Sequence, residues 1–336
     1  MEHHLLGRTG RLVSVVGLGT WQLGTDWGDV SEADAHAVLD AALEAGVTFV
    51  DTADVYGDGR SEQLVGSYLA ERPDAQVTVA TKMGRRVEQV PEAYTLEAFR
   101  GWVDRSRTNL RTDRLDLVQL HCPPTAVYSD DAVFDALDTL VEEGAIAAYG
   151  VSVETTAEAL AAVARANVAT VQIILNAFRL KPLDEVLPAA SEAGVGIIAR
   201  VPLASGLLSG RYTAQTTFAE TDHRTYNRHG ESFDVGETFS GVDYATGVEA
   251  AQEFSRLVDE LGAPDDDAPR LTPAQAALAW VWQQPGVSTV IPGARSAEQA
   301  RTNAAAGSAR VLGPTFERGV RRIYDERFRA ALHEKW

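Results

Sequence analysis

The feature that most constrains the fold is an alternation of short apolar runs and longer helical patterns along nearly the whole chain. The apolar runs lie near residues 13, 47, 76, 115, 146, 170, 195 and 287. The helical patterns that follow them cover residues 33–45, 61–71, 96–110, 130–143, 156–166, 183–193, 272–284 and 297–306. Eight units of a strand followed by a helix predict a closed (β/α)8 barrel of the TIM type, with parallel strands inside and helices outside.

Three segments do not belong to this repeat. Residues 5–13 contain two short apolar runs around a glycine turn, which predicts an N-terminal β-hairpin that caps the amino-terminal mouth of the barrel. Residues 203–271 form a long insertion after the seventh strand, polar and glycine-rich except for a helical pattern near 248–261. An insertion at this place is expected to lie over the carboxyl face as a lid. We therefore predict one domain over residues 1–336, with a final helix in residues 314–336.

Composition excludes several classes of partner. The chain has 336 residues, of which 45% are hydrophobic, so it can bury a large core. A formal charge of -18 argues against nucleic acid or an anionic membrane surface as a partner. The single cysteine, Cys122, allows no internal disulfide, which fits a reducing cytoplasm. We expect neither a signal peptide nor a membrane span, because no apolar run is long enough for either.

Ionisable side chains stand at the ends of three consecutive predicted strands. Asp51 ends the second strand, Lys82 the third and His121 the fourth, and Tyr56 follows Asp51 by five residues. In a parallel barrel the carboxyl ends of neighbouring strands converge on one mouth, where catalytic residues are placed. Each residue alone also fits a structural role, as a turn former, a surface cation or a satisfied core histidine. Their combination on neighbouring strands favours a catalytic site.

These four groups suit the reduction of a carbonyl. A carbonyl that accepts hydride develops negative charge on oxygen and needs a proton, which a tyrosine can donate. A lysine about 4 Å from the hydroxyl would favour the phenolate by about 4 kcal/mol, or about three pKa units, before burial opposes the effect. Asp51 would keep Lys82 charged, and a neutral His121 would orient the substrate oxygen.

Two local patterns predict the starts of helices. Ser61 precedes a helical pattern and is the expected N-cap of that helix. Ser296 and Gln299 form an S-x-x-Q capping box, so a helix is expected to begin at Ser296. The free N–H groups of a helix start bind phosphate, and Arg295 stands directly beside this one. A guanidinium there could pair with a phosphate group in a forked geometry.

With these motifs the chain resembles the aldo-keto reductases over almost its whole length. The segments that carry the resemblance are Gly17–Trp21, Phe49–Gly57, Ala80–Lys82, Leu117–His121, Gly150–Ser152 and Val290–Arg295. The resemblance implies a (β/α)8 barrel that binds NADPH in extended form and needs no metal. Arg295 at the helix start could then pair with the 2′-phosphate, which favours NADPH over NADH. It implies that Tyr56 is the proton donor, that Lys82 and Asp51 tune it, and that His121 orients the carbonyl of an aldehyde or ketone.

The resemblance also implies which residues bind the cofactor. Ser152 and Gln172 would address the carboxamide, the segment 202–207 would cover the pyrophosphate, and Gln299 and Asn303 would lie near the adenine. The full implied set is Gly19, Thr20, Trp21, Asp51, Ser152, Gln172, Arg200, Pro202, Leu203, Ala204, Gly206, Leu207, Arg211, Ile291, Gly293, Ala294, Arg295, Gln299 and Asn303.

The chain departs from the family pattern at four of its positions. Val153 replaces an asparagine, Gly293 a lysine and Gln299 an arginine, which places the chain nearer the bacterial, plant and channel-subunit-like branches. Arg200 stands where many members stack a tyrosine on the nicotinamide. Its charge would disfavour NADP+ by up to about 3 kcal/mol, unless Arg200 turns away and pairs with a carboxylate of the insertion.

Three functions remain open at this point. The first is an NADPH-dependent aldehyde or ketone reductase with a small-molecule substrate. The second is a regulatory subunit that binds NADPH and senses redox state with little turnover. The third is a lyase in which Lys82 forms a Schiff base with the substrate. The physiological substrate and the oligomeric state do not follow from the sequence.

Overall fold

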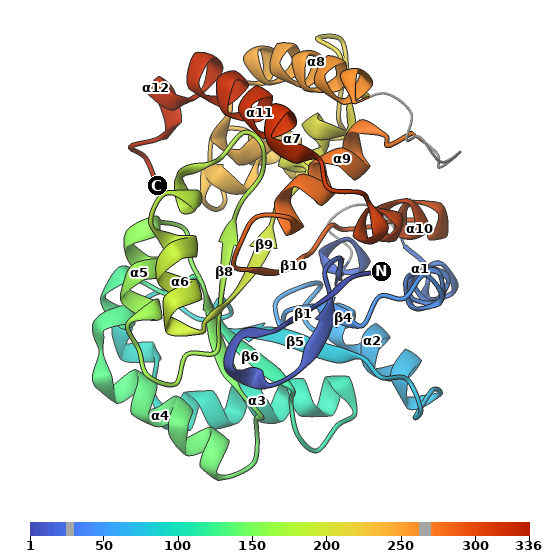
Figure 1. Cartoon of the computed structure of the whole chain (residues 1–336). Coiled ribbons are helices and arrows are strands. Elements are labelled where there is room, and N and C mark those ends of the chain that lie inside the picture. The colour runs from blue at the N-terminus through green and yellow to red at the C-terminus, as the bar shows by residue number, and fades with distance from the viewer. Residues whose placement is uncertain (25–29, 262–269) are drawn as a thin grey trace.

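Eight parallel strands form one curled sheet at the centre of the computed structural model, which describes residues 1–24, 30–261 and 270–336 (Figure 1). The strands are β3 (Leu18–Gly19), β4 (Phe49–Asp51), β5 (Thr78–Met83), β6 (Leu117–His121), β7 (Tyr149–Ser152), β8 (Thr170–Ile174), β9 (Gly196–Arg200) and β10 (Val287–Val290). Each pairs in parallel with its successor in the chain. Parallel bridges from Val16 to Val290 and from Gly19 to Gly293 complete the ring. The predicted (β/α)8 barrel is confirmed.

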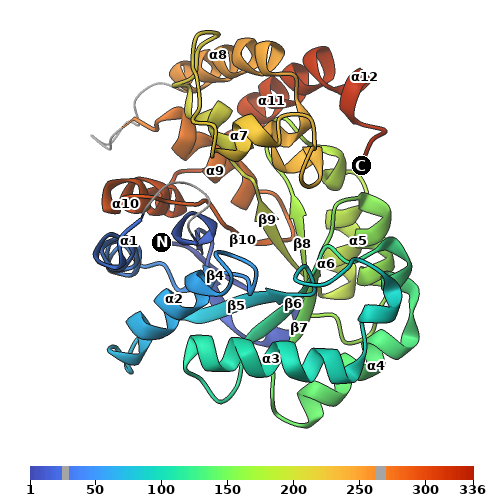
Figure 2. The same cartoon turned by 180° about the vertical axis from the view of Figure 1, so that it is seen from behind.

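Eight helices surround the ring, one after each strand or its loop (Figure 2). They are α1 (Glu32–Glu44), α2 (Arg60–Ala70), α3 (Leu96–Leu110), α4 (Asp131–Glu142), α5 (Thr156–Val163), α6 (Val186–Ala193), α9 (Pro273–Trp282) and α10 (Ala297–Ala305). Thr155 with Glu158, and Thr272 with Gln275, form capping boxes that satisfy the first N–H groups of α5 and α9. Among the described residues no helix is long and apolar enough to cross a membrane.

The N-terminal hairpin pairs β1 (His3–Leu5) with β2 (Leu12–Ser14) and closes the amino-terminal end of the barrel. Leu6 in its turn is fully buried and packs with inward-facing residues of the strands, among them Phe49 and Ile198. A Cβ on Gly7 would lie 2.9 Å from the Cα of Gly196, so the turn rests directly on the start of β9. The first barrel strand, predicted near residue 13, is instead β3 at Leu18–Gly19, because residues 12–14 belong to the hairpin.

The segment after β9 is long and mostly irregular, as predicted. It contains the 3-10 helices η6 (Ala204–Ser209), η7 (Val235–Glu237) and η8 (Phe239–Gly241) and the helices α7 (His223–Tyr226) and α8 (Tyr244–Glu260). Residues 262–269 of the predicted insertion lie outside the described residues. Ser205 Oγ donates to the Glu237 carbonyl at 3.1 Å and accepts from the Phe239 N–H at 2.9 Å, which anchors η7 and η8 beside the end of β9.

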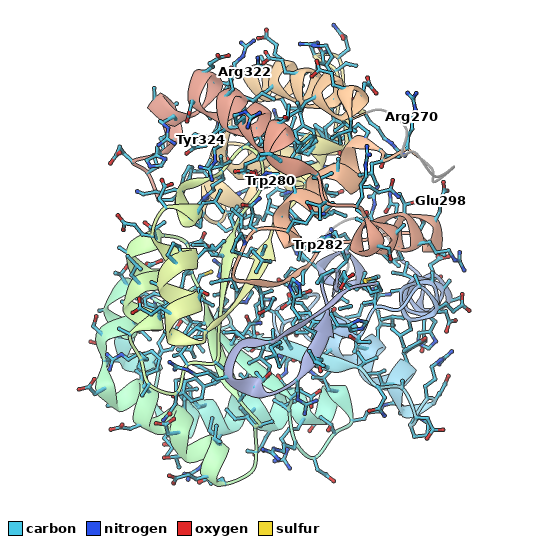
Figure 3. The ribbon with its side chains drawn as sticks, in the orientation of Figure 1. Arg270, Trp280, Trp282, Glu298, Arg322 and Tyr324 are labelled. Atoms are coloured by element: carbon cyan, nitrogen blue, oxygen red, sulfur yellow. The ribbon has the colours of Figure 1, made fainter. Side chains whose placement is uncertain are left out.

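The C-terminal residues form α11 (Gly313–Arg327) and α12 (Arg329–Leu332), and α11 packs along α8 (Figure 1). Two tryptophans of the barrel helix α9, labelled in Figure 3, bond to residues that follow α10 in the chain. Trp280 Nε1 donates to Glu317 of α11 at 2.6 Å, and Trp282 Nε1 donates to the Ala306 carbonyl at 2.9 Å. α8, which is part of the segment after β9, therefore packs against a helix that is itself bonded to α9.

Candidate active site

The four predicted catalytic residues lie together at the carboxyl ends of β4, β5 and β6. Strand register explains this arrangement. Asp51 of β4 pairs with Ala80 of β5. Lys82 lies two residues further along β5 and pairs with Gln119 of β6. The next inward position of β6 is His121. Tyr56 stands in the turn between β4 and α2, and its ring meets that of His121 edge-on at a centroid distance of 5.9 Å.

Lys82 is the centre of this group and is 1% exposed. Its ammonium forms a buried ion pair with Asp51 Oδ1. It also donates to the Thr52 carbonyl at 2.9 Å and to the Tyr56 hydroxyl at 3.3 Å. All three N–H donors are therefore used, and the ammonium is fixed beside the phenol.

Burial and neighbouring charges shift the pKa values of Lys82 and Tyr56 in opposite directions. Burial lowers the pKa of Lys82, but the Asp51 carboxylate and Tyr56 outweigh it, so this pKa lies above its usual value. Burial raises the pKa of Tyr56 more than the Lys82 ammonium lowers it. The opposing effect of burial, expected from the sequence, therefore exceeds the effect of Lys82 on the pKa of Tyr56, and Tyr56 carries its proton at neutral pH. A general acid needs that protonated state.

His121 is 5% exposed and uncharged at neutral pH. Burial lowers its pKa well below the usual value, and the nearby cations Arg85, Lys82 and Arg200 lower it further. Its Nδ1 has no hydrogen-bond partner among the described residues. A neutral imidazole in this position can donate a hydrogen bond to a substrate oxygen without competing with Tyr56 for the proton.

A buried amide pair completes the surroundings of Asp51. Gln172 Nε2 donates to Asp51 Oδ2 at 2.8 Å, and Gln119 Nε2 donates to the same oxygen at 3.2 Å. Gln172 was expected to address a carboxamide, but in this structure its Nε2 supports the carboxylate that pairs with Lys82. Gln119 was not predicted from the sequence, although it occupies the inward position of β6 one pleat before His121.

A cavity of about 270 Å³ runs from Tyr56 to the start of α10. Thirteen residues of the predicted cofactor set line it, namely Gly19, Thr20, Trp21, Asp51, Gln172, Arg200, Pro202, Leu203, Gly206, Ile291, Gly293, Arg295 and Gln299. Segments that are far apart in the sequence therefore form one elongated surface. Its walls at the Tyr56 end are aromatic and ionic, and its far end carries the first turn of a helix.

Six residues of the predicted set do not line this cavity: Ser152, Ala204, Leu207, Arg211, Ala294 and Asn303. Ala204, Leu207 and Ala294 are buried, whereas Arg211 is exposed on the outside. Ser152 Oγ instead accepts from the Cys122 thiol at 3.4 Å, and Asn303 donates to the Gly293 carbonyl at 3.2 Å. In this structure they support the neighbours of the cavity rather than its surface.

The start of α10 differs in detail from the predicted capping box. Ser296 is the N-cap and accepts from the Gln299 N–H at 3.2 Å, as expected. The Gln299 side chain, however, accepts from the N–H of Arg295 at 2.9 Å instead of from that of Ser296. Arg295 remains exposed at the cavity edge beside the first turn of the helix.

Comparison with known proteins agrees with this geometry. The profile of the Aldo/keto reductase family matches residues 15–316. The chain belongs to the aldo/keto reductase family. An uncharacterized oxidoreductase of Bacillus subtilis (strain 168) is 30% identical over 316 residues, which cover 93% of each chain.

Solved structures resemble this aldo/keto reductase over nearly its full length. A glycerol dehydrogenase from Gluconobacter oxydans has a TM-score of 0.78 at 28% identity and covers 97% of this chain and 96% of its own. An aldo/keto reductase from Klebsiella pneumoniae, solved in complex with NADP and acetate, has a TM-score of 0.70 at 25% identity. It covers 96% of both chains.

Ser205, which lines the cavity, belongs to the predicted segment 202–207, but seven other lining residues were not predicted from the sequence: Gln22, Val201, Tyr212, His223, Arg224, Glu237 and Pro292. Five of them belong to the irregular segment after β9, which has no periodic pattern to place them. Gln22 lies directly over Gly293, where any Cβ would collide with its amide. Gly293, which stands where the family pattern has a lysine, makes room here for the side chain of Gln22.

Arg200 lines the cavity but is held by two glutamates. Its Nη2 donates to Glu154 Oε2 at 2.8 Å, and its Nη1 lies 3.6 Å from Glu237 Oε1. Arg85 pairs with the same two glutamates, at 3.1 Å and 3.2 Å. The structure thus shows Arg200 paired with a carboxylate of the insertion, Glu237, which was one of the two alternatives raised for Arg200.

Cys122, Glu154 and Glu237 bring a thiol and two carboxylates within 4.8 Å of one another, a spacing that could hold a metal ion. Both carboxylates are already paired with Arg85 and Arg200, whose positive charges oppose a cation. Burial raises the pKa of the Cys122 thiol to about 12, so it is not a thiolate at neutral pH. This cluster is better described as an ion-pair network than as a metal centre.

Proposed function

We propose that the protein is an NADPH-dependent reductase that converts an aldehyde or a ketone into the alcohol, with Tyr56 as the proton donor. The observation that carries the proposal is the position of the Tyr56 hydroxyl. It lies 3.3 Å from Lys82 Nζ, and Tyr56 borders a cavity that reaches the first turn of α10. Membership of the aldo/keto reductase family supports the same chemistry.

The residues present fit NADPH. The cavity reaches from Tyr56 to the first turn of α10, so one bound molecule can contact both ends. The helix start at Ser296 and the exposed guanidinium of Arg295 suit the 2′-phosphate. The solved relative from Klebsiella pneumoniae in complex with NADP supports this assignment.

When bound, NADPH supplies the hydride that the carbonyl carbon accepts. Tyr56 donates its O–H proton to the carbonyl oxygen, so the substrate gains a hydride and a proton and becomes the alcohol. The Lys82 ammonium stabilises the phenolate that remains, and Asp51 keeps Lys82 in place through their ion pair. Neutral His121 holds the carbonyl oxygen by a hydrogen bond. Water then returns the proton to Tyr56.

We further propose that the described part of the insertion, residues 203–261, acts as a lid within a single domain. Tyr212, His223, Arg224 and Glu237 of this segment line the cavity. The anchoring of Glu237 and Phe239 by Ser205 keeps the segment over the carboxyl ends of the strands. A lid at this place would exclude water from the reacting atoms.

Substitution of Tyr56 by phenylalanine tests the proposed function. NADPH consumption, followed optically with a panel of aldehydes and ketones, should fall by about 100-fold or more. The dissociation constant of NADPH should hardly change, since the lost hydroxyl contacts the substrate. Tyr244→Phe, which removes a hydroxyl that donates to the Thr213 carbonyl at 2.9 Å, is the matched control. Near-normal turnover in Tyr56→Phe would exclude Tyr56 as the donor.

The same assay separates the other two functions. A regulatory subunit would bind NADPH but show little turnover with any carbonyl. A Schiff-base lyase would be trapped covalently at Lys82 by borohydride in the presence of a carbonyl substrate. The use of all three Lys82 donors within the protein disfavours that role.

A further inference from the structure

Arg200 depends on two glutamates to balance its charge at the Tyr56 end of the cavity. Glu154 lies 2.8 Å from one nitrogen of the guanidinium, and Glu237 lies 3.6 Å from another. Arg85 pairs with the same two carboxylates, so the group of two arginines and two glutamates has no net charge. The Arg200 side chain is only 9% exposed, and water therefore screens its charge little. Displacement of either glutamate would leave a net positive charge beside the cavity.

Trp336, which follows α12, is a buried side chain that packs behind both glutamates. It is 7% exposed and is not among the residues that line the cavity. Its ring contacts Arg179 in the loop after β8, and it lies against η7 at Gly236 and against η8 at Gly241. Its carbonyl accepts from Thr156 Oγ1 of α5 at 3.4 Å. One residue thus joins three segments that are far apart in the sequence.

The ring of Trp336 sets the position of Glu237 through the backbone on either side of it. Any Cβ on Gly241 would collide with the ring, so the backbone of η8 lies directly on it. A Cβ on Gly236, the residue before Glu237, would lie 3.4 Å from the ring atom Cε2. Removal of the ring would open a gap under both points, and the backbone that carries Glu237 could shift into it.

The same ring supports Glu154 through Arg179. The Arg179 guanidinium lies 4.0 Å over the centre of the Trp336 ring, and its Nη2 donates to the Glu154 carbonyl at 2.7 Å. Its Nε and Nη1 have no hydrogen-bond partner among the described residues. Burial, together with the charge of Arg200, lowers the pKa of Arg179 to about 9. The aromatic face therefore offsets part of the cost of burying this cation beside Glu154.

We propose that Trp336 is a positioning residue, which holds Glu154 and Glu237 against Arg200 so that the cavity accepts the positive charge of oxidised nicotinamide. This inference rests on the proposed reductase function. The hydride must pass to the carbon whose oxygen Tyr56 protonates, so the nicotinamide must lie at the Tyr56 end of the cavity. The nicotinamide ring is neutral in NADPH and positively charged in NADP+. An unbalanced Arg200 would therefore weaken the binding of NADP+ more than that of NADPH.

Calorimetric titrations with NADP+ and with NADPH test the inference through the ratio of the two dissociation constants. In Trp336→Ala the dissociation constant of NADP+ divided by that of NADPH should rise by about tenfold. Trp336→Phe keeps a ring beside Arg179 and should keep the ratio of the unchanged protein. Trp282→Ala removes a tryptophan of similar burial, 8% exposed, from α9 and is the matched control. A general loss of packing would affect both cofactors alike, so this control should leave the ratio unchanged.

The variant Glu237→Gln tests whether Trp336 acts through this carboxylate. The substitution removes the charge directly, so it should raise the same ratio by about tenfold on its own. In a chain that already carries Glu237→Gln, the further change Trp336→Ala should raise the ratio by less than about threefold, because effects that pass through one group do not add. A further rise of about tenfold would overturn the inference, since Trp336 would then act independently of Glu237.

The outcomes separate this inference from the proposed function. If the unchanged protein bound neither cofactor, the reductase function would be overturned and the inference with it. If both cofactors bound but Trp336→Ala left their ratio unchanged, the reductase function would stand and the inference would be wrong. Should Trp336→Ala fail to fold, Trp336→Leu takes its place. Leucine fills part of the space but offers no aromatic face to Arg179, so the same rise in the ratio is expected.

Discussion

Asp54 is a buried carboxyl group whose replacement should make the protein more stable at alkaline pH. It lies two residues before Tyr56 and is 1% exposed, and neither of its oxygens makes a well-formed hydrogen bond with a described residue. Burial and the nearby Glu62 raise its pKa to about 7, against the opposing influence of Arg86 and Arg105. These two arginines pair instead with the exposed Asp58.

The magnitude follows from the difference between the folded and unfolded states. Because the pKa of Asp54 is higher in the folded protein, the folded protein still holds the proton at pH values at which the unfolded chain has lost it. Stability therefore falls as the pH rises from the usual value of 3.8 to about 7 and then levels off. At about 1.4 kcal/mol per pKa unit, the full cost is about 4 kcal/mol. The substitution Asp54→Asn would keep the shape of the protonated group and avoid this cost.

Urea unfolding at pH 5 and pH 8, followed by circular dichroism, measures the effect. Relative to the unchanged protein, Asp54→Asn should gain about 3 kcal/mol more at pH 8 than at pH 5. Asp74→Asn, at an exposed position of similar charge, is the control and should show no such dependence. A stability difference that is the same at both pH values would refute the reasoning, since Asp54 would then not stay protonated in the folded state.

Three further substitutions test packing and cofactor binding. Gly66→Ala should destabilise the protein by about 2 kcal/mol in urea unfolding, because the new Cβ would lie 2.7 Å from the Leu110 backbone. This loss would exceed the gain of about 1 kcal/mol in helix propensity. A stabilised variant would show that α2 can move away from α3. In a titration, Arg295→Ala should weaken NADPH binding by about 1.5 kcal/mol and NADH binding far less. The preference for NADPH over NADH should also be smaller in high salt. Equal losses for the two cofactors would show that Arg295 does not contact the 2′-phosphate. Arg200→Tyr should change the ratio of the NADP+ and NADPH dissociation constants by less than about tenfold, because two glutamates already offset the charge of Arg200; a change of about 100-fold would show that they do not.

Much of the barrel and of the proposed catalytic group could be predicted because both follow from local patterns. Strand ends are marked by a change from apolar to polar residues, and the geometry of a parallel barrel brings such ends together. Asp51, Lys82 and His121 therefore needed no knowledge of distant contacts. The hydrogen bond from Gln119 of β6 to Asp51 was not predicted, because it depends on a contact between two strands.

The errors arose where tertiary contacts replaced local ones. Ser61 was expected to cap α2, but Gly59 occupies the N-cap, and Ser61 is buried in the first turn. Its hydroxyl donates to Thr20 Oγ1 at 2.8 Å, and Thr52 Oγ1 donates to it at 2.9 Å. A serine at this place connects β3 and β4 with α2, and no pattern within the helix reveals that.

The side chains that the segment after β9 contributes to the cavity were hidden for a related reason. Tyr212 is placed by its contact over Gly206, and Glu237 by its pairing with Arg85 and Arg200. These contacts join residues that have no regular spacing in the sequence. Irregular segments are specified by such individual contacts, whereas strands and helices are specified by periodic patterns.

The way in which the barrel closes has a consequence for how the chain folds. The ring closes through contacts such as the hydrogen bond from the Gly17 N–H to the Val290 carbonyl at 2.8 Å, between residues near opposite ends of the chain. Contacts so distant in sequence form late, because the chain must first lose the entropy of a very long loop. During synthesis the growing sheet keeps two unpaired edges until residues 287–293 leave the ribosome. Shortened chains that lack β10 should therefore associate through those edges rather than form a smaller barrel.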